Sequence, residues 1–194
     1  MDRIAHNVHG DSKKGEFWHD LEVGKRGEGS LEVRAILSRI FPSTSTILST
    51  DRDVDLSGSD LAVRTSHLTS LVQIKTLKDW DTIRQREPST LLEYAQGYTS
   101  TEPSYPGWWS KPSSASHILI NHYHDTNRFT AYWYPSLMKI WESGLGMRMI
   151  ESGCFELGSS PSFQDGRKWW SFYAIIPDRV LVDNGAVLMD SGFL

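Results

Sequence analysis

The sequence predicts one α/β or α+β domain in which helices flank a mixed central β-sheet. Two observations lead to this fold class. Segments of helical and strand periodicity follow one another in the order helix, hairpin, helix, hairpin, helix, strand, and such a mixture packs helices against a sheet. A length of 194 residues with 39% hydrophobic residues is also enough for one buried core.

A polar N-terminal arm, residues 1–19, is expected to precede the domain, which occupies residues 20–194. The arm has neither helical nor strand periodicity, and it lacks the apolar run of a signal peptide. No stretch of the chain has the length and apolar composition of a membrane span. The single Cys154 has no partner for an intrachain disulfide, so we expect a reducing, cytoplasmic setting.

The first periodic segment predicts a helix over about residues 26–41, because apolar side chains recur at helical spacing until Pro42 ends the run. Two strand-like runs follow, at 60–65 and 70–76, with a short polar stretch between them. Strand-like runs separated by so few residues are typical of a β-hairpin.

Downstream, the amphipathic segment 78–98 predicts a second helix, and the Ser- and Pro-rich stretch 99–116 predicts a loop. The remaining elements are a second hairpin, a third helix and a last strand, expected over 117–124 with 129–134, over 137–142 and over 170–176.

Polar residues of the first hairpin are expected to lie together. Side chains alternate across a strand, so Gln73 and Lys75 share one face. Antiparallel pairing puts Asp60 opposite Ile74 or Lys75, depending on the register. Carboxylate, amide and backbone carbonyl oxygens suit Mg²⁺ or Mn²⁺. A lysine beside such an ion can orient or deprotonate a bound water and offset charge on a phosphate.

The spacing of these residues resembles the signature of the PD-(D/E)XK nuclease superfamily, which has a restriction-endonuclease-like fold. Asp60 is followed thirteen residues later by Gln73-Ile74-Lys75, with Gln73 where most members have an acidic residue. The resemblance therefore implies a restriction-endonuclease-like core. One negative charge fewer should weaken cation binding and favours a single metal ion.

The resemblance extends on both sides of the hairpin, over about residues 20–182. The upstream segment DLEVGKRGEGSLEVRAIL resembles the first helix of such enzymes and maps their metal-binding glutamate onto Glu28, with Glu32 one turn further on as the alternative. The downstream segments SYPGWWSKPSSASHILI and FYAIIPDRVL resemble a Gly-Trp pair before a strand and a closing strand with a Pro turn.

The resemblance implies a metal-dependent nuclease that hydrolyses phosphodiester bonds, with DNA as the expected substrate. One Mg²⁺ or Mn²⁺ would have four ligands, namely Glu28, Asp60, Gln73 and the Ile74 carbonyl, and Lys75 would position the attacking water. The alternative is a non-catalytic nucleic-acid-binding or regulatory module that keeps the fold, with Gln73 marking decay of the metal site. A homodimer or a larger nucleic-acid-processing complex would suit cleavage of two strands.

Four residues outside the hairpin are candidates for contact with nucleic acid. Tyr94 and Gln96 belong to the predicted second helix, and Trp108 and Trp109 to the loop that follows it. Tryptophan rings can stack on unpaired bases. Packing of the loop against the core is the more frequent fate of tryptophan and stays open as the alternative.

Two other features bear on ligands. His122 and His124 share one strand face and suit zinc, but no third ligand is evident, and a surface strand is the simpler interpretation. The formal net charge is −4, from 20 basic and 24 acidic residues, which argues against a large basic face. Residues 61–115, with 6 basic and 5 acidic residues, are the net-positive third. We therefore expect weak, salt-sensitive binding of nucleic acid.

Overall fold

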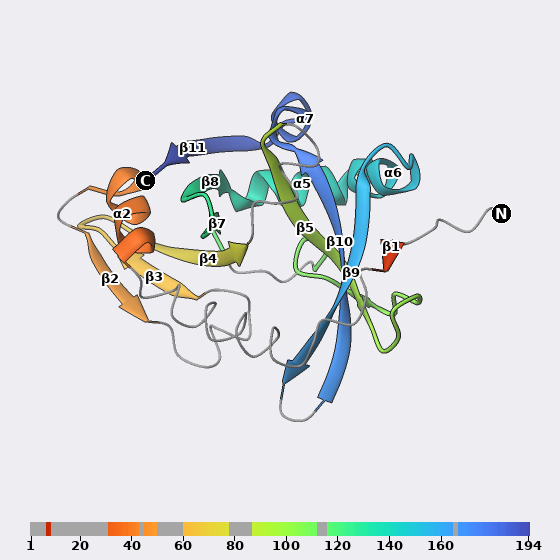
Figure 1. The fold of residues 1–194 in the computed structure, drawn as a ribbon. Helices are drawn as coiled ribbons and strands as arrows, with labels where there is room; N and C mark the ends of the chain where they lie inside the picture. The colour runs from red at the N-terminus through yellow and green to blue at the C-terminus, as the bar shows by residue number, and fades with distance from the viewer. Residues whose placement is uncertain are drawn as a thin grey trace.

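The computed structural model describes residues 7–8, 31–42, 45–49, 60–77, 87–111, 116–164 and 167–194. Over these residues the chain has a mixed α/β fold with two β-sheets and four helices (Figure 1). No helix in this part of the chain is long and apolar enough to cross a membrane. Glu28, the predicted helix ligand, lies outside the described residues.

The larger sheet has six strands and contains both predicted hairpins. The strands are, in spatial order, β11 (Val187–Phe193), β8 (Arg128–Trp133), β7 (Ile118–Tyr123), β4 (Thr69–Leu77), β3 (Leu61–Arg64) and β2 (Thr46–Ser49). β3 and β4 form one antiparallel hairpin and β7 and β8 the other, whereas β4 and β7 run parallel. The expectation of a mixed sheet is confirmed.

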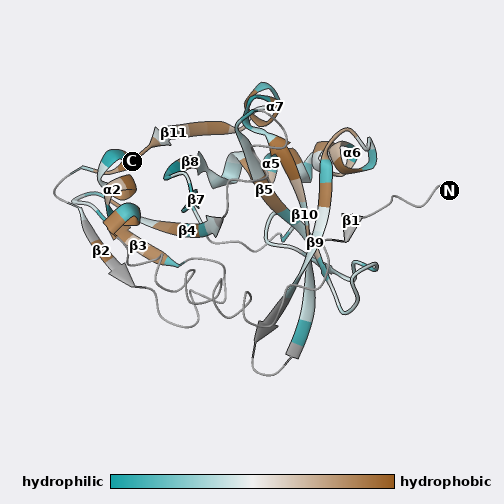
Figure 2. Ribbon diagram, viewed as in Figure 1, coloured by the Kyte–Doolittle hydropathy of each residue, from teal (hydrophilic) through white to brown (hydrophobic). Residues whose placement is uncertain are grey.

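Helix α2 (Leu31–Ile40) covers one face of this sheet and confirms the predicted helix over the described part of 26–41. Its buried residues Val33, Ile36 and Leu37 pack on apolar residues of β3, β4, β7 and β8. Figure 2 shows the hydrophobic residues of α2, β3 and β4 in brown. Near the end of α2, Arg39 forms an ion pair with Asp190 of β11 at 3.0 Å. The helix is thus attached across the sheet.

The sequence does not predict the second sheet. Its strands are, in spatial order, β1 (Asn7–Val8), β9 (Glu156–Gln164), β10 (Arg167–Pro177), β5 (Ser89–Gly97) and β6 (Tyr105–Pro106). β10 contains the predicted strand 170–176 and pairs antiparallel with β5 and β9. β1 pairs parallel with β9, so two residues of the predicted arm belong to this sheet.

Strand β5 lies where the sequence predicts the second helix, so that prediction is wrong over the described residues of 78–98. The pairing of β5 with β10 shifts register next to Phe172, and both Tyr94 and Ala95 contribute to the core. Such a bulge adds one residue to a strand and breaks its two-residue period. Apolar residues then recur three apart, as Leu92 and Ala95 do, which imitates helical spacing.

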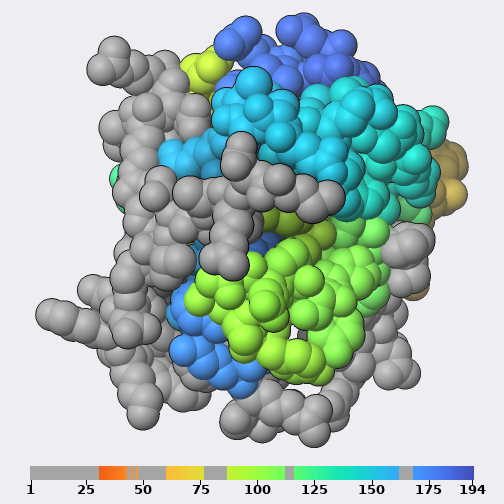
Figure 3. Space-filling model, turned by 90° about the vertical axis from the view of Figure 1, so that its right-hand side faces the viewer, coloured from red at the N-terminus to blue at the C-terminus, as the bar shows by residue number. Residues whose placement is uncertain are grey.

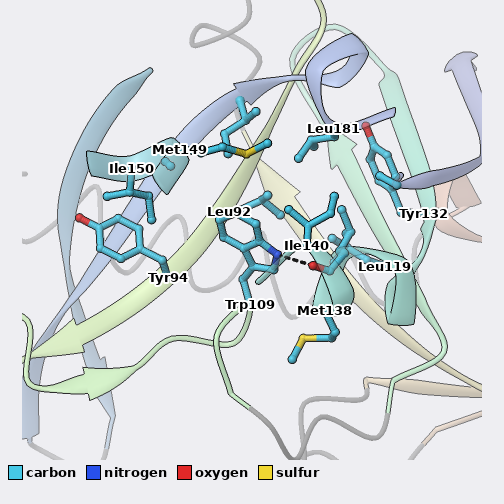
Figure 4. Close-up of a cluster of buried hydrophobic side chains, with 14 of the residues drawn as sticks. Leu92, Tyr94, Trp109, Leu119, Tyr132, Met138, Ile140, Met149, Ile150 and Leu181 are labelled. Atoms are coloured by element: carbon cyan, nitrogen blue, oxygen red, sulfur yellow. Dashed lines mark hydrogen bonds between the residues drawn. The ribbon is translucent and has the colours of Figure 1, made fainter. Parts of the chain in front are cut away.

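The main hydrophobic core lies between the two sheets and is closed by helices α5 (Tyr134–Glu142), α6 (Leu145–Glu151) and α7 (Asp178–Asp183). Figure 4 shows Trp109 in its centre, beside Leu92 and Ile140, with the indole N–H donated to the Leu137 carbonyl at 2.9 Å. α5 contains the predicted helix 137–142. The sequence does not predict α6 and α7, which are only one to two turns long.

A buried polar network joins the two sheets. The guanidinium of Arg128 on β8 lies 3.5 Å from Asp178 at the start of α7, and it donates a hydrogen bond to the Ser89 carbonyl of β5 at 3.0 Å. Asp178 also accepts hydrogen bonds from Thr90 at 2.7 Å and from Tyr132 at 2.9 Å. All five residues are at least nine-tenths buried. The ion pair therefore has the hydrogen bonds that a buried charge needs.

Two tyrosines complete this network as neutral donors. The Tyr123 hydroxyl donates to the Ser89 carbonyl at 2.6 Å, and the Tyr123 ring lies 3.8 Å from the Arg128 guanidinium carbon. Burial raises the pKa of Tyr123 and of Tyr132 well above the ordinary value of 10.0. Both hydroxyls therefore keep their protons at neutral pH.

The substitution Asp178→Asn should destabilise the protein strongly, because it leaves the Arg128 guanidinium buried without a counter-charge. Loss of one partner of a buried pair costs about 3–5 kcal/mol of unfolding free energy, which urea denaturation measures. Glu87→Gln is the control, since it removes only the exposed ion pair with Arg179. A change no larger than the control's would contradict the role given to the network.

Candidate functional site

Asp60 lies directly before β3 and its side chain reaches β4. Its backbone N–H donates to the Val72 carbonyl at 2.9 Å, and its Oδ2 accepts the N–H of Ile74 at 2.5 Å. Leu61 pairs with Val72, so continuing the register by one residue puts Asp60 opposite Gln73. The predicted backbone register, with Asp60 opposite Ile74 or Lys75, is therefore wrong, although the carboxylate does contact the Ile74 amide.

Strand β4 lies inside the sheet, between β3 and β7. Val72 and Ile74 belong to the core under α2. Gln73 and Lys75 alternate with them and face the second sheet. Gln73 is 3% exposed, and its Oε1 atom is buried without a hydrogen-bond partner. Gln73 thus presents a buried acceptor on the same face as Lys75.

Lys75 is half-buried and directs its ammonium toward an aromatic ring. Its Nζ lies 5.8 Å from the centroid of the Trp108 ring, within the range of a cation–π contact. Among the residues that the structure describes, no carboxylate forms an ion pair with it. Its positive charge is therefore not neutralised by a described side chain.

A close approach of the chain to β5 positions Trp108. A Cβ on Gly107 would lie 2.6 Å from the Glu93 carbonyl oxygen, so only glycine fits there. The two residues after Gly107 both form hydrogen bonds to Glu93 of β5. The Trp108 N–H donates to Glu93 Oε1 at 3.4 Å, and the Trp109 N–H donates to the Glu93 carbonyl at 2.9 Å. The Tyr134 hydroxyl donates to the Trp108 carbonyl. Trp108 is thereby fixed beside Lys75.

The structure separates the four residues predicted to contact nucleic acid. Trp109 is fully buried and Tyr94 is 8% exposed, both in the main core, so neither ring is accessible to a base and the prediction is wrong for them. The alternative of core packing is confirmed for Trp109. Burial also raises the pKa of Tyr94. Gln96 and Trp108 are half-buried, and Figure 3 shows the segment containing β5 and β6 in green at the surface.

Glu93 is a site residue that the sequence reading misses. Its carboxylate accepts hydrogen bonds from the Gln96 side chain at 2.9 Å and from the Trp108 N–H. It is thus connected to Lys75 through Trp108. A charged residue between the buried Leu92 and Tyr94 is typical of a strand whose side chains alternate between two faces. The sequence predicts a helix for this segment, so the alternation is not recognised.

Glu32, the alternative helix ligand, lies on α2, which covers the opposite face of β4. Its charge raises the pKa of His122 of β7, against the stronger lowering effect of burial. The structure therefore does not bring Glu32 to the face that bears Gln73 and Lys75.

His122 does not belong to a surface strand, so that interpretation is wrong. All six residues of β7 are buried, and His122 is 4% exposed with no hydrogen-bond partner at either ring nitrogen. Burial is the main cause that lowers its pKa, and His124 lowers it further.

The donors available at β4 are one carboxylate and neutral oxygens. Within the described ranges, no three histidine, cysteine, aspartate or glutamate side chains are grouped so that they could hold a metal ion. Asp60 supplies a carboxylate, and the unpartnered Gln73 Oε1 is an oxygen of the kind that hard cations bind. In a strand the carbonyl points to the same side as the N–H, so the Ile74 carbonyl points to the edge of β4 that faces β3. Oxygens of these three kinds are ligands that hard divalent cations accept.

Comparisons of this chain with protein-family models, with curated proteins and with solved structures find no match.

The low pKa of His122 predicts that the protein loses stability as the pH falls. Folded His122 binds a proton less readily than the histidine of the unfolded chain, whose pKa is near 6.5. The contribution of neutral His122 to the free energy of unfolding is therefore fully present above pH 6.5 and is lost as the pH falls below it. Between about pH 7.5 and about pH 5.5 the urea midpoint of the wild type should fall more than that of His122→Leu. Ile120→Leu, which changes a buried apolar residue of the same strand, is the control and should keep the pH dependence of the wild type. Equal pH dependence in His122→Leu and wild type would contradict the prediction.

Proposed function

We propose that this chain is a metal-dependent nuclease with a restriction-endonuclease-like core that hydrolyses phosphodiester bonds in DNA. The observation that carries the proposal is the hydrogen bond from the Ile74 amide to the Asp60 carboxylate, which joins the start of β3 to the Gln73–Lys75 segment of β4. Helix α2, Asp60, the β3–β4 hairpin and Gln-x-Lys follow in the order on which the resemblance to PD-(D/E)XK nucleases rests. The order of the elements and the hydrogen bond between Ile74 and Asp60 both support this proposal.

The residues that would hold the cation are Asp60, Gln73 and the Ile74 carbonyl, with Glu28 as a further ligand. When bound to these residues, Mg²⁺ or Mn²⁺ would supply Lewis-acid chemistry, that is, polarisation of the phosphate and activation of a water. The buried Gln73 Oε1 supports this assignment, because an acceptor that lacks a donor gains a partner when a cation binds.

Lys75 provides the positive charge of the reaction centre. Its ammonium rests against the Trp108 ring and is not neutralised by a described carboxylate. It is therefore available to hydrogen-bond the attacking water and to offset the charge that builds up on the phosphate. The water oxygen would attack phosphorus in line with the bond to the 3′ oxygen; as that P–O bond breaks, the water gives up a proton and the 3′ oxygen takes one up.

Substrate affinity is expected to be modest. With 20 basic and 24 acidic residues the chain has no excess of cations to contact phosphates, and the net-positive third, residues 61–115, contains Lys75 and Trp108. We propose that the protein acts in the cytoplasm and that a homodimer or a larger nucleic-acid-processing complex supplies the remaining contacts.

The substitution Lys75→Ala should abolish cleavage of plasmid and of single-stranded DNA in the presence of Mg²⁺ or Mn²⁺. Removal of one stabilising donor from a reaction centre typically lowers the rate by about 100- to 1000-fold, which gel assays of initial rates detect. Lys139→Ala, an exposed lysine on α5, is the matched control and should retain the wild-type rate. Near-UV circular dichroism checks that both variants are folded. Wild-type cleavage by Lys75→Ala would rule out the proposed mechanism.

A further inference from the structure

Asn121 on β7 is the neighbour of Lys75 across the parallel pair of strands. The register of β4 and β7 pairs Lys75 with Asn121 and Gln73 with Leu119. Paired residues of parallel strands point to the same face, so the Asn121 side chain shares the face of Gln73 and Lys75. Asn121 is fully buried, whereas Gln73 is 3% exposed. Two amides thus lie on neighbouring strands beside the proposed cation site.

Each of these amides has a buried oxygen without a hydrogen-bond partner. The Asn121 amide nitrogen donates a hydrogen bond to Thr130 Oγ1 of β8 at 3.4 Å. This hydrogen bond involves the nitrogen only and gives the amide oxygen no partner. Asn121 Oδ1 and Gln73 Oε1 accept no hydrogen bond. Buried acceptors that lack a donor destabilise a fold, and most buried polar groups in proteins are paired. Two of them lie on one sheet face, and Gln73 is also opposite Asp60; this arrangement points to a positively charged ligand.

We propose that Asn121 Oδ1 is a ligand of the same divalent cation, so that the cation site spans three neighbouring segments: the start of β3, β4 and β7. This inference rests on the proposed function. Amide oxygens are good ligands for Mg²⁺ and Mn²⁺, and a second one adds a donor where Gln73 replaces the usual acidic residue. The parallel pairing of β4 with β7 brings the two amides together.

Calorimetric titration with Mn²⁺ alone tests the inference without any nuclease assay. Asn121→Val removes the oxygen while keeping a good strand former and should weaken Mn²⁺ binding by at least about tenfold. Asn121→Asp keeps an oxygen and adds a negative charge, so it should bind Mn²⁺ more tightly than the wild type. Thr130→Ser is the matched control, because it changes an equally buried neighbour on the same face and keeps the hydroxyl oxygen that accepts from the Asn121 amide.

The outcomes separate this inference from the proposed function. If Asn121→Val binds Mn²⁺ like the wild type while Asp60→Asn does not bind it, Asn121 is no ligand and the proposed cation site stands. If the wild type binds no Mn²⁺, the cation site itself is wrong, and the inference falls with it. Where Asn121→Val fails to fold, as judged by near-UV circular dichroism, Asn121→Asp decides. If Asn121→Asp binds Mn²⁺ no more tightly than the wild type, the assignment of Asn121 as a cation ligand is wrong.

Discussion

The structure depends on the buried ion pair between Arg128 and Asp178. It connects β8 of the larger sheet to α7, which follows β10 of the smaller sheet, and through the Ser89 carbonyl it also holds the start of β5. The larger sheet carries Asp60 and Lys75, whereas Trp108 is positioned along β5. The contact between Lys75 and Trp108 therefore exists only while the two sheets keep their relative position. The geometry of the candidate site therefore depends on the buried network around Arg128 and Asp178.

The parts of the fold that sequence predicts are those fixed by neighbours along the chain. Two hairpins and α2 follow from periodicities and short turns within about twenty residues. The second sheet does not, because the pairing of β5 with β10 joins residues about eighty positions apart. Strand β5 is further disguised by the bulge that turns Tyr94 and Ala95 into the core. Local periodicity there favours a helix, and tertiary pairing overrides it.

The candidate site divides in the same way. Asp60 and the Gln73–Lys75 segment belong to one hairpin, so their proximity is predictable, although Asp60 lies opposite Gln73 and not opposite Ile74 or Lys75 as predicted. Glu93 and Asn121 join them only through β5 and through the crossover to β7, and no sequence spacing reports those contacts. The accessibility of Tyr94 and Trp109 likewise depends on which face each side chain takes, and burial in the core removes both from the surface.

Calorimetric titration of the wild type and Asp60→Asn with Mn²⁺ decides whether Asp60 and Gln73 bind a divalent cation beside Lys75, as we propose. Asp60→Asn keeps the size of the side chain and removes its charge. The account predicts a single saturable Mn²⁺ site in the wild type that is absent from a folded Asp60→Asn variant. Equal binding by both proteins, or no binding by either, as expected of a non-catalytic nucleic-acid-binding module, would contradict it.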